Sequence, residues 1–440
     1  MNLSGWGKYP TKACRLVAPR SVSEIVSFIK ESDLVARGNG RSYGDSSFNT
    51  TLTLSMEYFN CLLNFDDGKG IVEAEAGVLL KDIIDVFLPK GWFPPVSPGT
   101  KFVTLGGMIA ADVHGKNHHL TGSFGSHVLW LDIITAQGRI IRCGPNENCE
   151  LFQATIGGMG LTGIILRAAF KLQRVETGWI RQQTLVASNL KHVMELFNHS
   201  ADWEYTVAWV DCSASGMRAG RSLLFRGNHL SLSNLNSGIK VLPSVPISPN
   251  SLRVGIEMPS WLISSFVIKT FNKLYFLKGA FSSKQRVLRW DSFFYPLDKI
   301  ANWNRLYGKR GFIQFQCVFP LEKSYQGLLA ILEQLNKVGE YSCLSVLKLF
   351  GENKFPFSFP MEGYTLALDF PANPSVFELV KKLDDITVKY GGRIYLAKDA
   401  LLSREILEAS DPRMKSFSEF RRKIGAHKHF NSEQSKRLSI

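Results

Sequence analysis

Three glycine-rich clusters in the first 166 residues constrain the fold and ligand of this chain more than any other feature. They are "ARGNGRSYGDSS" at 36–47, the stretch 97–138, and "ATIGGMGLTGIIL" at 154–166. Glycine lets a backbone approach a ligand closely, and successive N–H groups can then bind an anion. Three such clusters predict a backbone that wraps along one extended ligand, which is too long for a single phosphate loop.

The segments around the first cluster predict α/β-type alternation with short connections. Apolar residues at helical spacing predict a helix in "SVSEIVSFIKES", with Ser21 or Ser23 as its cap. "DLVAR" indicates a short strand that leads into the glycines, and "TLTLSM" and "GIVEAEAG" indicate two more strands. A second helical stripe runs from Leu80 to Leu88.

The first cluster matches neither of the familiar nucleotide-binding motifs. Gly38, Gly40 and Gly44 are spaced G-x-G-x-x-x-G, strand-like sequence follows them, and the lysine of a P-loop is missing. Glycine N–H groups, with donors from Arg41 and Ser42, nevertheless favour a bound pyrophosphate over a purely structural turn. From this run alone both interpretations stay open.

Composition limits the class of protein and of partner. With 440 residues, 45% of them hydrophobic, the chain is long enough for two or three domains. Its net charge of +14 favours an anionic partner, such as nucleic acid, an anionic membrane or a phosphorylated ligand. We do not expect nucleic acid, because no helix-turn-helix, zinc-finger or RNA-recognition pattern is present.

The cysteines and the N-terminal sequence indicate a cytoplasmic protein. Seven scattered cysteines without a CxxC pair indicate reduced thiols. His118 and His119 are adjacent and lack a third ligand, so we expect no metal. "MNLSGWGKYPTKACRL" lacks the apolar core of a secretory signal, and no apolar run reaches the length of about 18 residues that a spanning helix needs.

Basic charge is concentrated between Gly238 and Trp290, where eight lysines and arginines accompany one acid, Glu257. Within this block, "SWLISSFVIKTFNKLYFLKGAF" combines aromatic residues with three lysines. One interpretation is a segment that lies on an anionic membrane and forms a mobile lid over the substrate site. The other is a helix of a substrate domain whose lysines are merely solvated. The sequence leaves both open.

Three blocks in the order "RGNGRSYGD", "PGT…TLGGMIAADVHGKNHH…GSFG" and "GGRIYLAKD" carry a family resemblance. They resemble the decaprenylphosphoryl-β-D-ribose 2′-oxidases, within the vanillyl-alcohol-oxidase type of FAD oxidoreductase. The resemblance extends from Gly5 to the tail "EFRRKI…SKRL". It implies that the first glycine run holds the pyrophosphate of FAD. It also implies an α+β fold, with a two-part FAD-binding domain at 1–176 and 393–440 and an inserted substrate-binding domain with an antiparallel sheet at 177–392.

The resemblance also implies roles for individual residues. The FAD-binding residues would be Ala36, Arg37, Gly38, Asn39, Gly40, Arg41, Ser42, Tyr43, Gly44, Asp45, Ser46, Gly99, Thr104, Leu105, Gly106, Gly107, Ala111, Asp112, Val113, His114, Ile164 and Tyr395. The catalytic residues would be Lys398, Gln316 and His114. The substrate-binding residues would be Lys116, Gln314, Gln316, Lys348, Thr365 and Lys398, and strand alternation places the two glutamines on one face.

This chain departs from the family and superfamily patterns at three positions. Arg41 stands where many relatives carry a histidine that bonds covalently to the flavin, so we expect non-covalent FAD. Ala367 replaces the family's reactive cysteine, and Thr365 replaces an asparagine. These changes leave the chemistry intact and bear on which sugar and lipid are accepted.

The implied reaction is oxidation of the 2′-hydroxyl of a polyprenylphosphoryl-β-D-ribose-like glycolipid, with hydride passing to the flavin. Lys398 would take the proton of the sugar hydroxyl or stabilise the alkoxide that develops there. In the family a separate short-chain NAD(P)H dehydrogenase reduces the keto sugar, which completes an epimerisation to arabinose for cell-envelope polysaccharide. Two alternatives stay open: an aldonolactone or alditol oxidase acting on soluble sugars, and a catalytically silent flavoprotein subunit.

Overall fold

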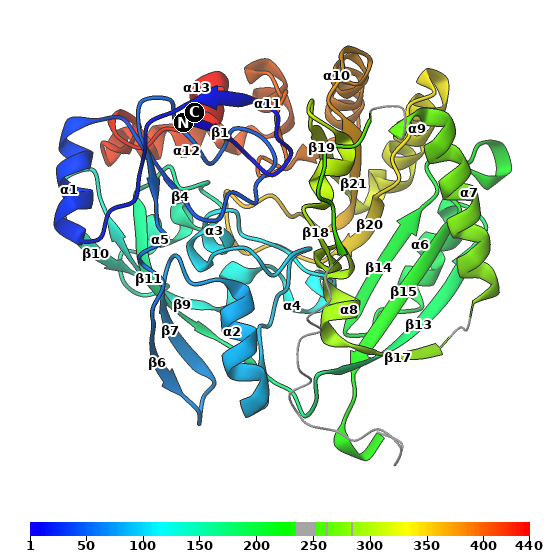
Figure 1. Ribbon diagram of the computed structural model, residues 1–440, viewed down its shortest axis with the longest axis horizontal. Coiled ribbons are helices and arrows are strands. Elements are labelled where there is room, and N and C mark those ends of the chain that lie inside the picture. The colour runs from blue at the N-terminus through cyan, green and yellow to red at the C-terminus, as the bar shows by residue number, and fades with distance from the viewer. Residues whose placement is uncertain (235–251, 260–262, 283–284) are drawn as a thin grey trace.

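The computed structural model describes residues 1–234, 252–259, 263–282 and 285–440 (Figure 1). The molecule has two halves. The glycine-rich first part of the chain and its last helices form one half, and both termini belong to it. A large sheet and its covering helices form the other half.

The first half contains a small parallel sheet and a larger antiparallel one. The parallel sheet has the order β3 (Leu16–Val17), β5 (Thr53–Ser55) and β4 (Val35–Arg37). The antiparallel sheet has the order β10 (Ile140–Cys143), β9 (Val128–Ile134), β11 (Ile164–Lys171), β7 (Ile71–Glu75) and β6 (Leu62–Asp66). A hairpin of β1 (Asn2–Ser4) and β2 (Thr11–Ala13) lies at the N-terminus.

The local predictions for this half are confirmed. Helix α1 (Val22–Glu31) begins at Ser21, whose hydroxyl accepts a hydrogen bond from the N–H of Glu24. The strand that leads into the glycines is β4, and the second helical stripe is α2 (Leu80–Phe87). The remaining helices of this half are α3 (Leu105–Ala110), α4 (His118–Thr121), α5 (Cys149–Thr155), α11 (Arg404–Ser410), α12 (Arg413–Lys423) and α13 (Glu433–Leu438).

The second half is built on an eight-stranded sheet in which every pairing is antiparallel. Its order is β17 (Gln285–Arg289), β13 (Trp179–Ala187), β15 (Ser222–His229), β14 (Tyr205–Val210), β20 (Ser345–Phe350), β21 (Gly363–Pro371), β19 (Phe312–Pro320) and β22 (Arg393–Ile394). The antiparallel sheet expected from the family resemblance is therefore present.

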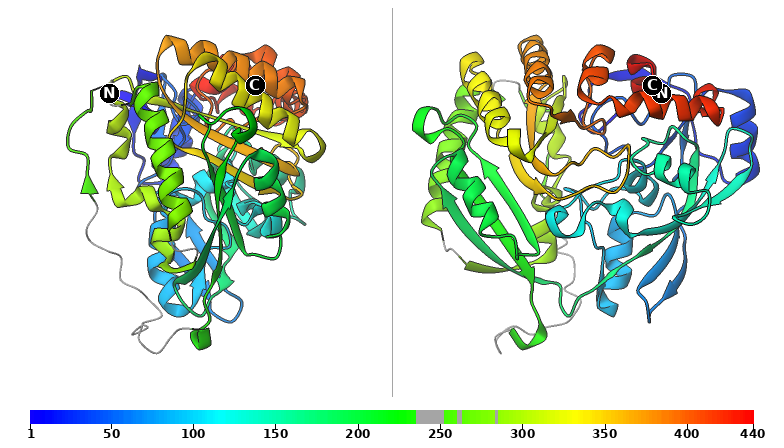
Figure 2. Two further views of the ribbon diagram at one scale, coloured as in Figure 1. Left: turned by 90° about the vertical axis from the view of Figure 1, so that its right-hand side faces the viewer. Right: turned by 180° about the vertical axis from the view of Figure 1, so that it is seen from behind.

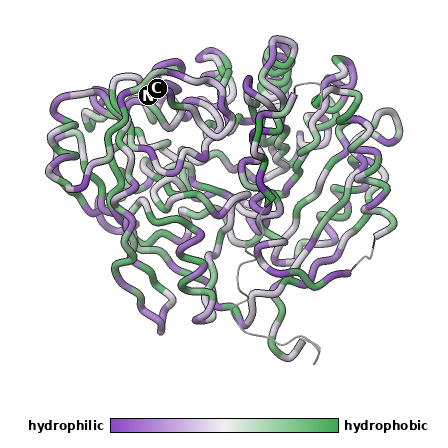
Figure 3. The backbone as a smooth tube through the Cα atoms, viewed as in Figure 1, coloured by the Kyte–Doolittle hydropathy of each residue, from purple (hydrophilic) through white to green (hydrophobic). Residues whose placement is uncertain are grey.

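Three helices cover one face of this sheet, as the view from behind shows (Figure 2). Their apolar side chains and those of the strands form a hydrophobic core between helices and sheet. The three helices are α6 (Leu190–Asn198), α9 (Ser324–Val338) and α10 (Pro374–Lys389). Apolar side chains of β19, β20 and β21 pack against them, and Figure 3 shows hydrophobic residues following the strands of both halves.

The other face of the large sheet is turned toward the first half, and only part of it carries helices. Helix α7 (Ser265–Phe281) lies across β13 and β15, and the short helix α8 (Trp290–Phe294) follows β17. Gly279 allows α7 to approach closely, because a Cβ there would lie 2.1 Å from a methyl of Leu223. The uncovered part of this face, at β14, β20, β21 and β19, is free to line a cavity.

After β22 the chain returns to the first half, where α11, α12 and α13 pack. This path is the one that a two-part FAD-binding domain requires. The boundaries at 176 and 393 themselves stay a prediction.

Candidate active site

A cavity of about 790 Å³ lies between the two halves. Its walls come from the loops of all three glycine clusters on one side and from the uncovered face of the large sheet on the other. Lining residues therefore come from the beginning, the middle and the end of the chain.

Most of the residues expected to bind FAD line this cavity: Ala36, Gly38, Asn39, Gly40, Arg41, Ser42, Tyr43, Ser46, Gly99, Thr104, Gly106, Gly107, Ala111, Val113, His114 and Tyr395. The expected catalytic residues Lys398, Gln316 and His114 line it as well. Among the expected substrate residues, Lys116, Gln314 and Lys348 join them. The fold thus gathers three distant parts of the sequence around one space.

Three expected FAD residues hold the first loop in place and do not line the cavity. The Arg37 guanidinium donates hydrogen bonds to the carbonyl of Ser4, at 2.8 Å, and to the hydroxyl of Ser47, at 3.0 Å. At Gly44 a Cβ would lie 1.8 Å from the carbonyl oxygen of Asp399, so the two loops touch there. Asp45 pairs with Arg437 at 2.8 Å.

Three further expected FAD residues are buried behind the cavity wall. Leu105 and Ile164 belong to hydrophobic cores. Asp112 is fully enclosed, and its carboxylate accepts hydrogen bonds from the Ser123 hydroxyl, at 2.5 Å, and from the N–H of Gly125, at 2.7 Å. The motif therefore includes side chains that shape the loops as well as backbone that faces the ligand.

The glycine-lined end of the cavity fits FAD. A Cβ added at Gly99 or Gly160 would meet no protein atom within 4 Å, so the backbone at these positions faces open space. Gly38 packs so closely on Thr104 that a Cβ would lie 2.1 Å from its hydroxyl oxygen. Arg41 lines the same space, and its Nε is buried without a hydrogen-bond partner among the described residues. A glycine cradle beside an arginine whose Nε has no hydrogen-bond partner in the described part of the chain suits the long, anionic shape of a flavin dinucleotide.

Lys398 lies in the loop that follows β22, facing the first glycine loop. Its ammonium nitrogen stands 3.9 Å from the centre of the Tyr43 ring, in cation–π contact. Asp369 on β21 lines the same part of the cavity and accepts a hydrogen bond from the Gln314 amide. Burial lowers the pKa of Lys398 and raises that of Asp369, and the attraction between the two opposite charges offsets part of both changes.

Gln316 is held in a fixed orientation by two acceptors. Its amide nitrogen donates to Nε2 of His114 and to the hydroxyl of Thr365, each at 3.1 Å. The His114 ring must be neutral to accept at Nε2, and burial does lower the pKa of His114 well below its usual value. Thr365, expected to bind substrate, is buried, and its hydroxyl donates a hydrogen bond to the carbonyl of Cys317, at 2.8 Å. It positions Gln316 and is not among the residues that line the cavity.

Positive charge predominates in the cavity. The lining cations are Arg41, Lys116, Arg286, Lys348 and Lys398, and the lining carboxylates are Asp298 and Asp369. Burial lowers the pKa of Lys116 to about 7 and that of Lys348 to about 8. Buried lysines that lie near one another bind their protons weakly. An anionic ligand would raise their pKa again and so stabilise their charged form, which makes the cavity favourable for an anion.

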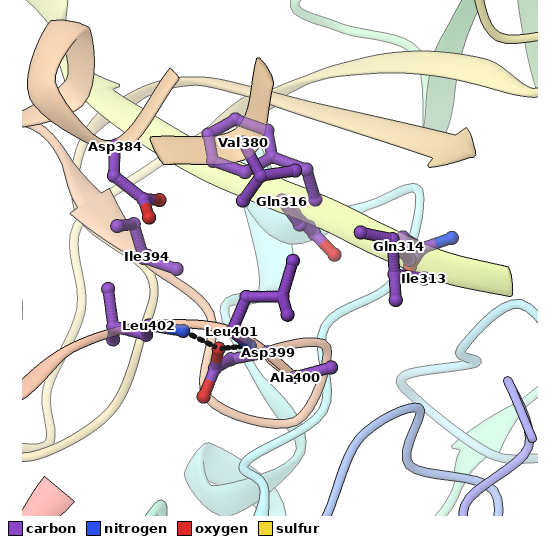
Figure 4. A pocket seen from close by; sticks show the side chains of 11 residues that line it. Ile313, Gln314, Gln316, Val380, Asp384, Ile394, Asp399, Ala400, Leu401 and Leu402 are labelled. Carbon is purple, nitrogen blue, oxygen red and sulfur yellow. Dashed lines mark hydrogen bonds between the residues drawn. The ribbon is translucent and has the colours of Figure 1, made fainter. Parts of the chain in front are cut away.

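A clamp formed by Asp399 and Arg437 holds the Lys398 loop. The Asp399 carboxylate accepts hydrogen bonds from the N–H groups of Leu401, at 2.8 Å, and Leu402, at 2.7 Å, and Figure 4 shows it below Gln314 and Gln316 of β19. Its second oxygen lies 2.8 Å from the guanidinium of Arg437 on α13. Arg437 bridges Asp399 and Asp45, so one arginine ties the Lys398 loop to the first glycine loop.

The sequence analysis missed several residues of the site. Asp369 could have been found, because strand alternation places it on the same face as Ala367, two residues before it. The clamp of Asp399 and Arg437 could not be predicted from a local pattern. Arg437 belongs to a helix near the end of the chain, whereas the first glycine loop that it ties to the Lys398 loop lies near the beginning. Trp6, whose ring lies 4.1 Å from the Arg41 guanidinium, was also missed.

Comparison with known proteins agrees with this geometry. Residues 14–144 match the FAD binding domain family. The chain is 34% identical to the decaprenylphosphoryl-beta-D-ribose oxidase of Mycolicibacterium smegmatis, over 100% of this chain and 97% of that protein. It is 28% identical to an uncharacterized protein of Streptomyces coelicolor, over 82% of this chain and all of that protein.

A more distant likeness is limited to part of the chain. The chain is 29% identical to the L-gulonolactone oxidase of Bos taurus, over 46% of this chain and 45% of that protein. The likeness over the full length, the match to the FAD binding domain family and the cavity between the two halves all indicate the same class of enzyme. The chain is an FAD-dependent oxidoreductase that acts on a CH–OH group, and it belongs to the decaprenylphosphoryl-β-D-ribose oxidase family.

Proposed function

We propose that this enzyme oxidises the 2′-hydroxyl of a polyprenylphosphoryl-β-D-ribose-like glycolipid to the 2-keto sugar. The observation that carries the proposal is the cluster of Lys116, Lys348 and Lys398 in the same cavity as Gln316 and the glycine loops. Lysines that face a cavity suit a phosphorylated sugar better than a neutral one. The name of the Mycolicibacterium smegmatis relative supports the same substrate.

The protein's own residues would bind and orient the sugar and move its proton. FAD, when bound, supplies the hydride acceptor. Gln316, fixed by His114 and Thr365, presents its amide oxygen to the sugar. Lys398 has a lowered pKa, so its neutral amine can accept the hydroxyl proton and its ammonium form can stabilise an alkoxide. The opposite charge of Asp369 would stabilise the ammonium form of Lys398.

The keto product would leave for a second enzyme. Net epimerisation to arabinose requires hydride delivery to the opposite face of the sugar, and we assign this step to a separate short-chain NAD(P)H dehydrogenase. We also propose that FAD is held non-covalently, because Arg41 occupies the position of the linking histidine.

The lipid tail of the substrate requires contact with a membrane surface. None of the described helices is long and apolar enough to cross a membrane. Helix α7 offers an interfacial contact instead: Phe266 is 79% exposed and Phe281 is 87% exposed. Lys269, Lys273 and Lys278 of the same helix would attract an anionic surface. Two further residues of the basic block, Lys240 and Lys284, lie outside the described residues, and the lid role stays a prediction.

An aldonolactone or alditol oxidase is the competing function. A comparison of flavin reduction by polyprenylphosphoryl-β-D-ribose, free pentitols and L-gulonolactone separates the two. The proposal predicts rapid reduction by the glycolipid and little by the soluble sugars. Faster reduction by a pentitol or lactone would favour the competing function, and no reduction by any of them would indicate a catalytically silent flavoprotein.

A further inference from the structure

One part of the cavity has walls that contain none of the residues expected to bind FAD or the sugar. It is lined by Val207, Trp209, Phe225, Phe271 and Tyr275, from β14, β15 and α7, and we call these five residues the apolar arm. None of them belongs to the glycine loops or to the Lys398 loop. The arm is continuous with the rest of the cavity, so a ligand in the sugar site can extend into it.

The register of the large sheet fixes where the arm lies relative to the sugar residues. Gln316 pairs with Ala367, Ala367 pairs with Val346, and Val346 pairs with Trp209. Directly paired residues of antiparallel strands lie on the same face, so these four form one row across the sheet. Lys348 lies two residues after Val346 and therefore points to the same face. From β19 to β15 the cavity wall changes from amide to lysine to aromatic, and beyond β15 it continues with Gln182 and Arg286.

This order matches the covalent order of a glycolipid of the proposed class. Neighbouring strands lie about 4.8 Å apart, so β19 and β20 are separated by roughly 10 Å, and β20 and β15 by about the same distance. The first interval accommodates a pentose between Gln316 and the phosphate at Lys348. The second accommodates about two isoprene units between Lys348 and Phe225.

The arm is shaped for an apolar chain and leads outward. The Trp209 indole N–H donates to the carbonyl of Cys343, at 3.0 Å, so its polar atom is satisfied and its ring is left for packing. The Tyr275 ring lies 4.7 Å from the Trp209 ring, and the Phe271 ring stacks on Tyr275 at 5.7 Å. Phe271 is 46% exposed and Tyr275 is 37% exposed, so the arm reaches the surface at α7.

We propose that the apolar arm is a binding site for the first isoprene units of the substrate's lipid tail, directly beyond the phosphate. This inference rests on the proposed function for its choice of ligand. Burial of isoprene methyl groups against Trp209 and Phe225 would favour prenyl phosphates over phosphates without a tail. The remaining tail would leave the arm beside α7 and enter the membrane there.

The test measures binding, without any oxidation step. The affinities of FAD-loaded protein for geranyl monophosphate and monomethyl phosphate are determined by isothermal titration calorimetry. The variants are Val207→Trp, which fills the arm, and Phe225→Ala, which removes one of its walls. Phe28→Ala is the matched control, because Phe28 is a half-buried phenylalanine of α1 that packs in a separate core.

We expect the wild type and Phe28→Ala to bind geranyl monophosphate at least tenfold more tightly than monomethyl phosphate. Val207→Trp should lose this preference, with unchanged affinity for monomethyl phosphate. If Val207→Trp no longer retains FAD, Phe225→Ala decides, and its preference should fall severalfold. Equal binding of the two phosphates by the wild type, or a preference retained in the informative arm variant, would overturn the inference.

Failure of the proposed function has a different signature. In that case ribosylated prenyl phosphate would not reduce the flavin, whatever the affinity for geranyl monophosphate. Tight binding of geranyl monophosphate without flavin reduction by the ribosylated prenyl phosphate would therefore show that the arm binds a prenyl tail but that the enzyme oxidises another sugar. A fatty acid that displaces geranyl monophosphate as strongly as a prenyl phosphate does would show that the arm is a general lipid site and would contradict the inference.

Discussion

Lys398 stands where the first glycine loop, the large sheet and the C-terminal helices meet. Its ammonium group contacts the Tyr43 ring and is attracted by the opposite charge of Asp369, whereas glycine backbone forms the cofactor cradle. Lys398→Ala should therefore retain FAD and slow flavin reduction by the glycolipid about 10²–10³-fold, the usual effect of removing one preorganised charge. Stopped-flow bleaching of the flavin measures the rate, and Lys309→Ala, an exposed lysine, is the control. A rate within a few-fold of wild type would exclude Lys398 from the reaction.

The two lysines that we propose for the phosphate should make binding depend on pH. Burial lowers the pKa of Lys116 to about 7 and that of Lys348 to about 8. Both therefore lose positive charge as the pH rises through this range, while a phosphodiester stays negative. The Kd of the glycolipid, obtained from the substrate dependence of flavin reduction, should rise with pH by up to about tenfold per unit for each deprotonated lysine. Lys348→Met should flatten the dependence. A Kd that stays constant or falls between pH 7 and pH 9 would contradict it.

At the scale of elements, Arg437 of α13 connects two loops that have no sequence relation. Its removal leaves the buried carboxylates of Asp45 and Asp399 without their common partner. Arg437→Gln should lower the free energy of unfolding by about 3 kcal/mol, the effect of breaking a buried ion pair. It should also weaken FAD binding and slow flavin reduction, because both loops loosen.

Urea unfolding and FAD titration measure these effects. The matched control is Arg404→Gln, whose ion pair with Glu408 is exposed to solvent and should contribute little to stability. If the two variants were equally stable, the clamp would have no structural importance.

Helices and strands with strong local patterns could be predicted from the sequence. The predictions of α1, α2 and the strand before the first glycines were correct, because each element is determined by a pattern within about ten residues. Alternation also placed Gln314 and Gln316 on one face, and both line the cavity. The row that joins Gln316 to Trp209 was not predictable, because it depends on the pairing of four strands from distant parts of the chain.

A motif alone also could not separate residues that face the ligand from residues that support the loop. Arg37, Asp45 and Asp112 were expected at FAD, yet their side chains bind protein groups behind the cavity wall. Thr365 was expected at the substrate; in the structure its hydroxyl accepts the hydrogen bond that orients Gln316, and its contact with substrate stays a prediction. The distinction depends on the direction of each side chain, which a glycine-rich loop without a regular period does not encode.

For the whole molecule, the exposed surface of α7 predicts weak and salt-sensitive membrane binding. Each lysine near an anionic surface contributes about 1 kcal/mol. Lys269, Lys273 and Lys278 changed together to glutamate should abolish co-sedimentation with anionic vesicles at low salt. The control changes Lys309, Lys323 and Lys337, exposed lysines elsewhere, and alters the net charge by the same amount. Equal loss in both variants would mean that total charge, and not α7, determines binding.

Oxidation of the 2′-hydroxyl is the single reaction that we propose for this cavity, its lysines and the row of residues across the large sheet. It is measured by anaerobic flavin reduction with polyprenylphosphoryl-β-D-ribose that carries deuterium at C2′, compared with the same glycolipid deuterated at C3′. Deuterium at C2′ should slow reduction severalfold, because the C2′–hydrogen bond breaks as hydride leaves the sugar, and deuterium at C3′ should have almost no effect. Equal rates for the two substrates, or slowing by deuterium at C3′ only, would show that the enzyme does not oxidise the 2′-hydroxyl.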